Sequence, residues 1–201
     1  MSLLPLFPLQ VVLFPGMGLP LHIFEPRYKE MIGELLERKE PFGVVRALDN
    51  GIAEVGCTAE ILEVAKRYDD GRLDIITEGR KRFEILHLDQ ERSFLRGDVL
   101  FFEDEPAEAD RQQLARLLEL HGQAIKILEA DMEVPPADEP GLSFHLAAVM
   151  PFDLDFKQTL LGMRSESDRV KALLEYYQAI MPNLKRAVHA RKKAGGNGHV
   201  P

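Results

Sequence analysis

Apolar residues in the first hundred positions occur in short runs that turn residues separate. The first run, from Leu4 to Tyr28, is almost entirely apolar, yet five prolines interrupt it. Because proline lacks a backbone N–H and fixes φ, neither a helix interior nor a central strand passes easily through these positions. The pattern therefore predicts two short strands, at 10–14 and 19–24, joined by a tight turn at Pro15 and Gly16.

A helix is predicted from Pro26 to about Lys39. Its apolar residues recur at i, i+3, i+4, i+7 and i+8, which places them on one helical face: Tyr28, Met31, Ile32, Leu35 and Leu36. Pro26 suits the first helical position, and Glu25 before it can accept hydrogen bonds from unpaired N–H groups of the first turn. Pro41 ends the helix.

The pattern between residues 42 and 103 predicts further strands with turns between them. The predicted strands are 42–48, 55–68, 72–77, 82–88 and 95–103. Turns are indicated at Asp49-Asn50-Gly51 and at Asp69-Asp70-Gly71. Because many short strands leave exposed edges unless the sheet closes, the pattern favours a closed or nearly closed barrel with one inserted helix.

The pattern changes at an acidic break around Pro106, which we take as a domain boundary. Helical spacing then predicts helices at 109–129, 142–150 and 156–163, and a longer helix that follows Ser165, breaks at Pro182 and resumes to about Arg191. The polar, glycine-rich end predicts disorder. The expected organisation is α+β, with a barrel over 1–105, a helical bundle over 106–190 and a disordered tail over 191–201.

Composition limits the classes of function. The chain has 201 residues, of which 45% are hydrophobic and 29% charged, as in ordinary globular proteins. Its net charge of −8 argues against non-specific binding of nucleic acid. A single cysteine, Cys57, excludes an intramolecular disulfide and fits a reducing cytoplasm. No apolar run approaches the roughly 20 residues that cross a bilayer, and the N-terminal prolines argue against a signal peptide. We expect a soluble cytoplasmic protein.

The sequence shows none of the common catalytic or metal-binding patterns. It has no G-x-x-x-x-G-K-[ST] loop, so no ATP site is expected. The six histidines show no i, i+4 pairing and no H-E-x-x-H, so no metal is expected. Cys57 is predicted to be a small buried residue rather than a nucleophile, and no G-x-S-x-G motif is present. We therefore expect no catalytic residues, no cofactor and no enzymatic activity.

The segment from His22 to Tyr28 is the best candidate for binding, since it joins a predicted strand to a helix N-terminus, where N–H groups can face a ligand. The candidate partner-binding residues there are His22, Phe24, Glu25, Arg27 and Tyr28. The structural alternative, which we favour, is that Arg27 pairs with a carboxylate, Tyr28 begins the apolar helical face and His22 bonds to the backbone.

A short basic cluster, Gly79-Arg80-Lys81-Arg82-Phe83, is predicted to lie between two strands. Arg80 and Arg82 are further candidates for contact with a phosphate or an acidic peptide. The alternative, which is favoured, is a solvated turn in which Phe83 anchors the next strand.

Several motifs, taken in order, resemble the N-terminal domain of Lon proteases, above all the small proteins that consist of that domain alone. They are LPLFPL, VVLFPG and LPLHIFEPRY, the FGVV run that follows, and then GCTAEI, DGR and GRKRF. The resemblance covers the first half strongly and the helical second half more loosely. It implies a PUA-like six-stranded β-barrel with one inserted helix, followed by a C-terminal helical bundle.

In Lon proteases this domain is implicated in recognising substrate polypeptide and in assembly. The resemblance therefore implies a non-enzymatic module that binds an unfolded polypeptide or a protein partner and assists proteolysis in trans, with the cleft between barrel and helices as the expected place. The ATPase and serine-lysine peptidase parts of Lon are not found in the sequence.

Three alternatives stay open. PUA-like barrels often bind RNA, although the acidic balance weighs against it. A small-molecule pocket, as in a related Lon-like ubiquitin-ligase receptor, is a second alternative, but that receptor's pocket lies in a zinc-bearing domain whose cysteines are missing here. An unrecognised hydrolase is the least favoured.

Overall fold

The computed structural model describes residues 3–106 and 109–196, with the side chains of 185 and 187–196 left aside. The chain divides into two compact units. The first comprises Met1–Asp104 and Ala147–Arg164, and the second comprises Glu105–Leu146 and Ser165–Pro201. None of the helices in the described ranges has both the length and the apolar content needed to cross a membrane.

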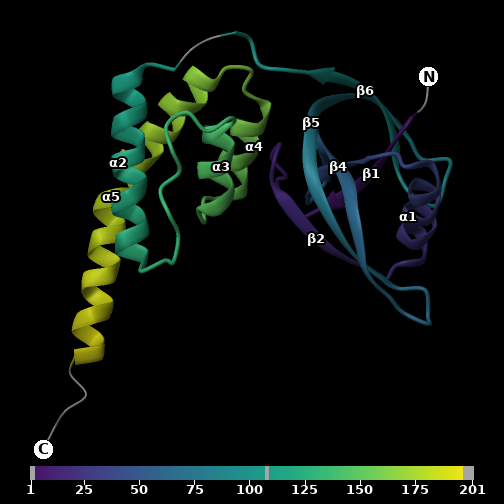
Figure 1. Ribbon diagram of the computed structural model, residues 1–201, viewed down its shortest axis with the longest axis horizontal. Coiled ribbons are helices and arrows are strands. Elements are labelled where there is room, and N and C mark those ends of the chain that lie inside the picture. Colours follow the sequence, from purple (N-terminus) through teal and green to yellow (C-terminus); the bar gives the residue numbers. More distant parts are fainter. Residues whose placement is uncertain (1–2, 107–108, 197–201) are drawn as a thin grey trace, which may run out of the picture. The chain divides into compact units, whose positions relative to one another are not determined.

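The first unit is built on a six-stranded sheet that closes on itself as a ring (Figure 1). Its strands are β1 (Leu4–Leu9), β2 (Gly18–Ile23), β3 (Phe42–Leu48), β4 (Gly51–Arg67), β5 (Leu73–Asp89) and β6 (Arg96–Phe102). The strand order is β2-β5-β4-β3-β1-β6, and a further pairing of β5 with β6 closes the ring. β1 and β3 pair in parallel, whereas all other pairs are antiparallel.

Large apolar side chains fill the ring where glycines leave room for them. Leu6, Val45 and Phe83 form a buried cluster, and a Cβ added at Gly56 would lie 2.5 Å from the Phe83 ring. Helix α1 (Pro26–Arg38) connects β2 to β3 and turns Tyr28, Met31, Ile32 and Leu35 inward. The Tyr28 ring stacks on Phe7 of β1 with their centroids 4.0 Å apart, which fixes the helix against the ring.

Three of the predicted strands differ from those of the structure. Residues 10–14 form no strand; the first strand is instead β1, at 4–9, despite its prolines. Leu13 and Phe14 are nevertheless buried, because this segment packs closely on β5: a Cβ at Gly79 would lie 2.2 Å from the Phe14 carbonyl oxygen. The two strands predicted at 72–77 and 82–88 are one continuous strand, β5, so the basic cluster is not a turn.

The helices of the second half are α2 (Arg111–Leu128), α3 (Leu142–Val149), α4 (Leu154–Gly162) and α5 (Glu166–Gly196). Asp110 and Asp153 cap α2 and α4 through hydrogen bonds from their carboxylates to backbone N–H groups. The sequence predicts one bundle over 106–190, but the structure groups 147–164, including α4, with the first unit. The amide of Gln158 donates to the carbonyl of Val55 at 2.9 Å within that unit.

The core of the second unit contains several buried polar side chains. Tyr177 of α5 and His121 of α2 are both fully buried, and the Nδ1 of His121 lies 2.6 Å from the Tyr177 hydroxyl. The buried Arg169 donates from Nε to Ser143 at 2.7 Å and from a second nitrogen to Glu166 at 2.7 Å. These polar groups, rather than apolar packing alone, define how α2, α3 and α5 meet within this unit.

Helix α5 differs from its prediction at two places. It passes through Pro182 without a break, because the lost N–H costs only one intrahelical bond while Met181 is held in the core. It also continues over residues 191–196, where we predict the start of a disordered tail. Residues 191–194 of that stretch are arginine, lysine and alanine, which are good helix formers, whereas the two glycines that end it are poor ones. Residues 197–201 lie outside the described residues.

Candidate functional site

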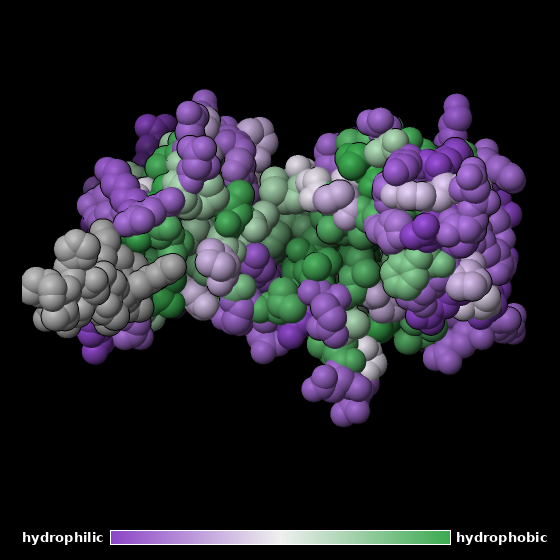
Figure 2. Space-filling view, turned by 90° about the horizontal axis from the view of Figure 1, so that it is seen from below, coloured by the Kyte–Doolittle hydropathy of each residue, from purple (hydrophilic) through white to green (hydrophobic). Residues whose placement is uncertain are grey.

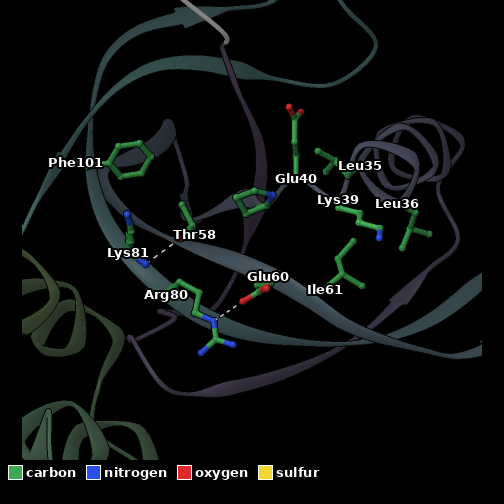
Figure 3. A pocket seen from close by; sticks show the side chains of 11 residues that line it. Leu35, Leu36, Lys39, Glu40, Thr58, Glu60, Ile61, Arg80, Lys81 and Phe101 are labelled. Atoms are coloured by element: carbon green, nitrogen blue, oxygen red, sulfur yellow. Dashed lines mark hydrogen bonds and ion pairs between the residues drawn. The ribbon is translucent and has the colours of Figure 1, made fainter.

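The first unit contains a hollow of about 680 Å³ at the C-terminal end of α1, which we call the α1–β4 groove. Figure 3 shows the side chains that surround it. They come from α1 and the residues that follow it, from β4, from β5 and from the end of β6: Leu35, Leu36, Lys39, Glu40, Pro41, Thr58, Glu60, Ile61, Arg80, Lys81 and Phe101.

The end of α1 shapes one wall of the groove. Lys39 adopts a left-handed conformation with φ of 55°, and its N–H bonds to the carbonyl of Leu35. The N–H of Glu40 reaches the same carbonyl at 3.2 Å, and Pro41 then excludes another helical turn. This tight stop leaves Leu36 half-buried at the groove, with Lys39 beside it.

β4, β5 and β6 supply the opposite wall. The backbone N–H of Lys81 donates to the Thr58 hydroxyl at 2.9 Å, which ties the two strands together at an irregularity in their pairing. Ile61 is half-buried, and Phe101 is 51% exposed while its ring meets Phe83 edge-on at 6.4 Å. The wall therefore combines a fixed backbone with apolar side chains that are open to solvent.

Charge in the groove is unevenly compensated. Arg80 donates from Nε to Glu60 at 2.6 Å and also binds Glu78, and its bond to Glu60 raises the pKa of its guanidinium. The ammonium groups of Lys39 and Lys81, by contrast, form no ion pair with any residue in the described part of the chain. The groove thus has two cations that the protein itself does not neutralise.

Exposed apolar side chains are also frequent elsewhere on the first unit. They include Phe24, Leu48, Leu62, Ile76, Leu86, Leu88 and Leu100. Figure 2 shows apolar residues gathered in patches among charged ones on the face that it presents. None of these seven residues lines the groove, so substitutions of them are suitable controls for binding experiments on the groove.

The structure divides the predicted site at 22–28 into unrelated parts. His22 and Phe24 belong to an aromatic cluster with Tyr68, in which the His22 ring stacks on Phe24 at 5.9 Å and meets Tyr68 edge-on at 5.8 Å. His22 contacts a carboxylate rather than backbone: its Nδ1 lies 2.5 Å from Asp74. Hydrogen bonds from His22 and then from Tyr68 lower the pKa of Asp74.

The other three residues of that segment stabilise the start of α1. Glu25 is the N-cap, but its side chain caps no N–H group, contrary to prediction; it pairs with Arg27 at 2.8 Å instead. Arg27 lies 4.6 Å above the Tyr28 ring, and Tyr28 is buried on Phe7, so that burial raises the pKa of its hydroxyl. Residues 26 and 38 are about 18 Å apart along the helix, so this cluster lies far from the groove.

Arg82, another of the predicted site residues, is buried rather than exposed. Within the first unit it pairs with Asp104, donates to the carbonyl oxygens of Leu161 and Met163, and covers the Phe102 ring at 4.7 Å. Of the predicted site residues, only Arg80 lines the α1–β4 groove.

The groove can hold a ligand, but it offers no recognisable catalytic group. Cys57 is buried nearby, and burial raises its pKa to about 12, which leaves the thiol protonated. Within the described ranges, no group of three His, Cys, Asp or Glu side chains is placed to hold a metal ion. Apolar contact, charge and backbone hydrogen bonding are the interactions available there.

Sequence reasoning missed most of the groove, namely Leu36, Lys39, Ile61 and Phe101. Each looks like an ordinary surface or core residue in its own segment, and only the closed ring brings α1, β4 and β6 together. The one available signal was the helix stop at Lys39-Glu40-Pro41, which predicts where α1 ends but not what faces it.

Comparisons with known proteins agree with this architecture. A family model described as the ATP-dependent protease La (LON) substrate-binding domain matches residues 3–179. Lon protease 1 of Hydrogenovibrio crunogenus is 31% identical over 82% of this chain, and Lon protease of Parabacteroides distasonis is 33% identical over 67% of it. The chain spans 22% and 17%, respectively, of the length of these two curated relatives.

Two solved structures are similar as well. The Lon N-terminal domain protein from Xanthomonas campestris superimposes with a TM-score of 0.71 at 25% identity, covering 88% of this chain and 99% of that one. The N-terminal domain of Mycobacterium avium complex Lon protease gives 0.63 at 16% identity, covering 88% and 98%, which supports the fold alone. The chain therefore belongs to the family of Lon substrate-binding domains.

Proposed function

We propose that this chain is a non-enzymatic recognition module, which binds exposed apolar side chains of an unfolded polypeptide in the α1–β4 groove and presents that polypeptide to a protease acting in trans. We also propose that its ring of strands is a PUA-like barrel and that the remaining helices form a bundle. Membership of the Lon substrate-binding family supports substrate recognition, and the groove supplies a place for it.

The observation that carries the proposal is the apolar lining of an open hollow. Its volume of about 680 Å³ lies within the range of roughly 300–1,000 Å³ typical of ligand sites. Leu36, Ile61, Pro41 and Phe101 present apolar surface there, and Phe101 is half exposed. A hollow of this size holds one or two large side chains, which suits a polypeptide whose apolar residues are not yet buried.

Strand β4 supports an extended polypeptide as the ligand. Its residues up to Ala59 pair with β3 on one side, whereas residues 60–67 have strand partners only on the β5 side. Glu60 and Ile61, at the start of this one-sided stretch, line the groove. Backbone N–H and C=O groups beside an apolar pocket are the elements of recognition by strand addition.

The test is fluorescence anisotropy of a labelled, permanently unfolded protein titrated with the purified chain. We expect saturable binding, and Ile61→Ser should weaken it about 10-fold or more, since burying an apolar side chain contributes roughly 1.5–3 kcal/mol and 1.4 kcal/mol corresponds to a factor of about ten. Leu62→Ser is the matched control: it changes an exposed leucine next to Ile61 that does not line the groove. Equal binding by both variants and the parent would refute the groove as the site.

Substitution of a buried residue would not test binding, because it would also destabilise the fold. Tyr28→Ala would remove a buried ring from α1 and test folding rather than binding. Labelled single-stranded RNA, run beside the polypeptide, tests the RNA alternative. Binding of RNA without binding of polypeptide would replace the proposal by that alternative.

A further inference from the structure

Resting on the proposed function, we propose that the α1–β4 groove selects a particular class of polypeptide segment: one in which a large apolar side chain is flanked by carboxylates. The apolar side chain would enter the hollow, and the carboxylates would meet Lys39 and Lys81. Three observations in the groove support this preference.

The first observation concerns the ammonium groups of the two lysines. Lys39 and Lys81 are exposed at the groove and make no ion pair among the described residues. Most arginines of the first unit are used differently: Arg46 pairs with Asp155 at 2.7 Å, and Arg96 pairs with Asp89 at 2.8 Å. The lysines at the groove are therefore available to an external anion.

The second observation is that the carboxylates near the groove do not neutralise these lysines. Glu60 is bound to Arg80 at 2.6 Å. Glu40 lines the groove, but Figure 3 shows its carboxylate directed away from Lys39 and Lys81. The ammonium groups of Lys39 and Lys81 thus stay without a paired carboxylate among the described residues that line the groove.

The third observation is the arrangement of charge around the apolar surface. Lys81 lies beside Phe101, whereas Lys39 lies on the other side, beside Leu36 and Ile61 (Figure 3). In an extended chain, the immediate neighbours of an apolar residue point away from it, whereas the residues two positions before and after it share its side, each about 6–7 Å away along the backbone. Carboxylates at these two positions would therefore lie on the face that meets the hollow, one toward Lys39 and one toward Lys81.

The expected preference is modest, because both lysines are exposed. An exposed ion pair is screened by salt, and two such pairs together change affinity by about 2- to 10-fold. The apolar contact would supply most of the binding free energy, and the charges would determine which of several apolar segments binds most tightly.

The experiment compares three labelled peptides that differ only at the two positions flanking one phenylalanine on the same side of an extended chain, two residues before and two residues after it: both are Asp, both Asn or both Lys. At low salt we expect the Asp peptide to bind about 3- to 10-fold more tightly than the Asn peptide, and the Lys peptide to bind most weakly. The double variant Lys39→Gln/Lys81→Gln should abolish this order, and salt at about 0.5 M should compress it.

A charge-matched control separates the groove from the overall field. The double variant Lys126→Gln/Lys171→Gln removes the same charge from exposed residues that do not line the groove, and the preference should survive in it. Equal affinities for the three peptides, all weakened by Ile61→Ser, would overturn the charge preference while leaving the proposed function intact. Failure of all three peptides and of the unfolded protein to bind would overturn both proposals.

Discussion

Arg80 and Arg82 lie two residues apart on β5, yet they belong to different kinds of region. The pairing of β5 with β4 shifts register between Gly79 and Arg82, which interrupts the regular alternation of side chains between the two arginines. The Arg80 side chain is 44% exposed at the groove, whereas that of Arg82 is 4% exposed. The difference in exposure arises because the segment that includes Leu161 and Met163 covers Arg82, and the carbonyl groups of these two residues accept its hydrogen bonds.

Two cations in one sequence motif thus serve opposite purposes in this protein. The buried arginine holds segments of the first unit together, and its loss would be felt in folding. The exposed arginine and the lysines of the groove have their charges in water, where they contribute little to stability and are free to influence binding.

The largest effect is expected for Arg82→Met. The substitution removes the cation but leaves Asp104 and the two carbonyl groups of Leu161 and Met163 without it, which should lower the free energy of unfolding by roughly 3 kcal/mol. Urea denaturation measures the loss, with Arg80→Met as the matched control. A loss below about 1 kcal/mol would show that Arg82 is not the structural residue described above.

The next effect concerns a buried group that has to stay neutral. Burial, with a smaller contribution from His145, lowers the pKa of His121 to about 4. An unfolded histidine has a pKa of about 6.5, so the unfolded state gains a proton first. Stability should be unaffected above pH 7 and should fall by up to about 3 kcal/mol as the pH drops from 6.5 to 4.

His121→Gln tests this by keeping a hydrogen-bonding side chain near Tyr177 without a titrating ring. Unfolding free energies measured by urea denaturation between pH 7 and pH 4 should fall less steeply in this variant than in the parent. Parallel pH profiles would mean that other groups account for the acid sensitivity.

A smaller effect is expected at the aromatic cluster. Phe24 is 59% exposed, so Phe24→Ser should change the unfolding free energy by less than about 1 kcal/mol. If the groove is the binding site, this variant should bind the unfolded protein with the same affinity as the parent in anisotropy titrations. A loss as large as that of Ile61→Ser would return the cluster around His22 to the list of binding surfaces.

The smallest effect should come from Arg80→Gln. Its ion pairs with Glu60 and Glu78 are exposed, so stability should change by no more than about 1 kcal/mol. Release of Glu60 would place an uncompensated carboxylate at the groove, and affinity for the Asp-flanked peptide should fall about 2-fold. An increase in that affinity would contradict the assigned role of charge.

Residue pattern predicted local structure well where a single segment decides it. The helix after Pro26 and the strands at 42–48 and 96–102 follow from periodicity and from proline positions. The pattern failed at 10–14, where burial under β5 produces apolar residues without a strand, and at 79–82, where charges suggested a turn inside a continuous strand. In both places the neighbouring chain, rather than the segment itself, decides the conformation.

The candidate site was harder to predict for the same reason. Arg80 was identified as a binding candidate, but its role depends on Glu60, Lys39 and Phe101, which belong to three other elements. Tyr28 and Arg82 looked equally suitable in the sequence, although the folded chain buries both. Residue type indicated which side chains could form ion pairs or apolar contacts with a ligand, but only the folded structure shows which of them are exposed enough to do so.

The pairing of β2 has a consequence for synthesis of the chain. β2 pairs with β5 alone, so residues 18–23 gain a strand partner only after residues 73–78 have been synthesised. At translation rates of about 5–20 residues per second, the intervening stretch takes roughly 3–10 seconds to emerge. During that time the apolar residues of β2 have no strand to pair with, so this part of the nascent chain is itself, for a few seconds, the kind of exposed polypeptide that the folded form is proposed to bind.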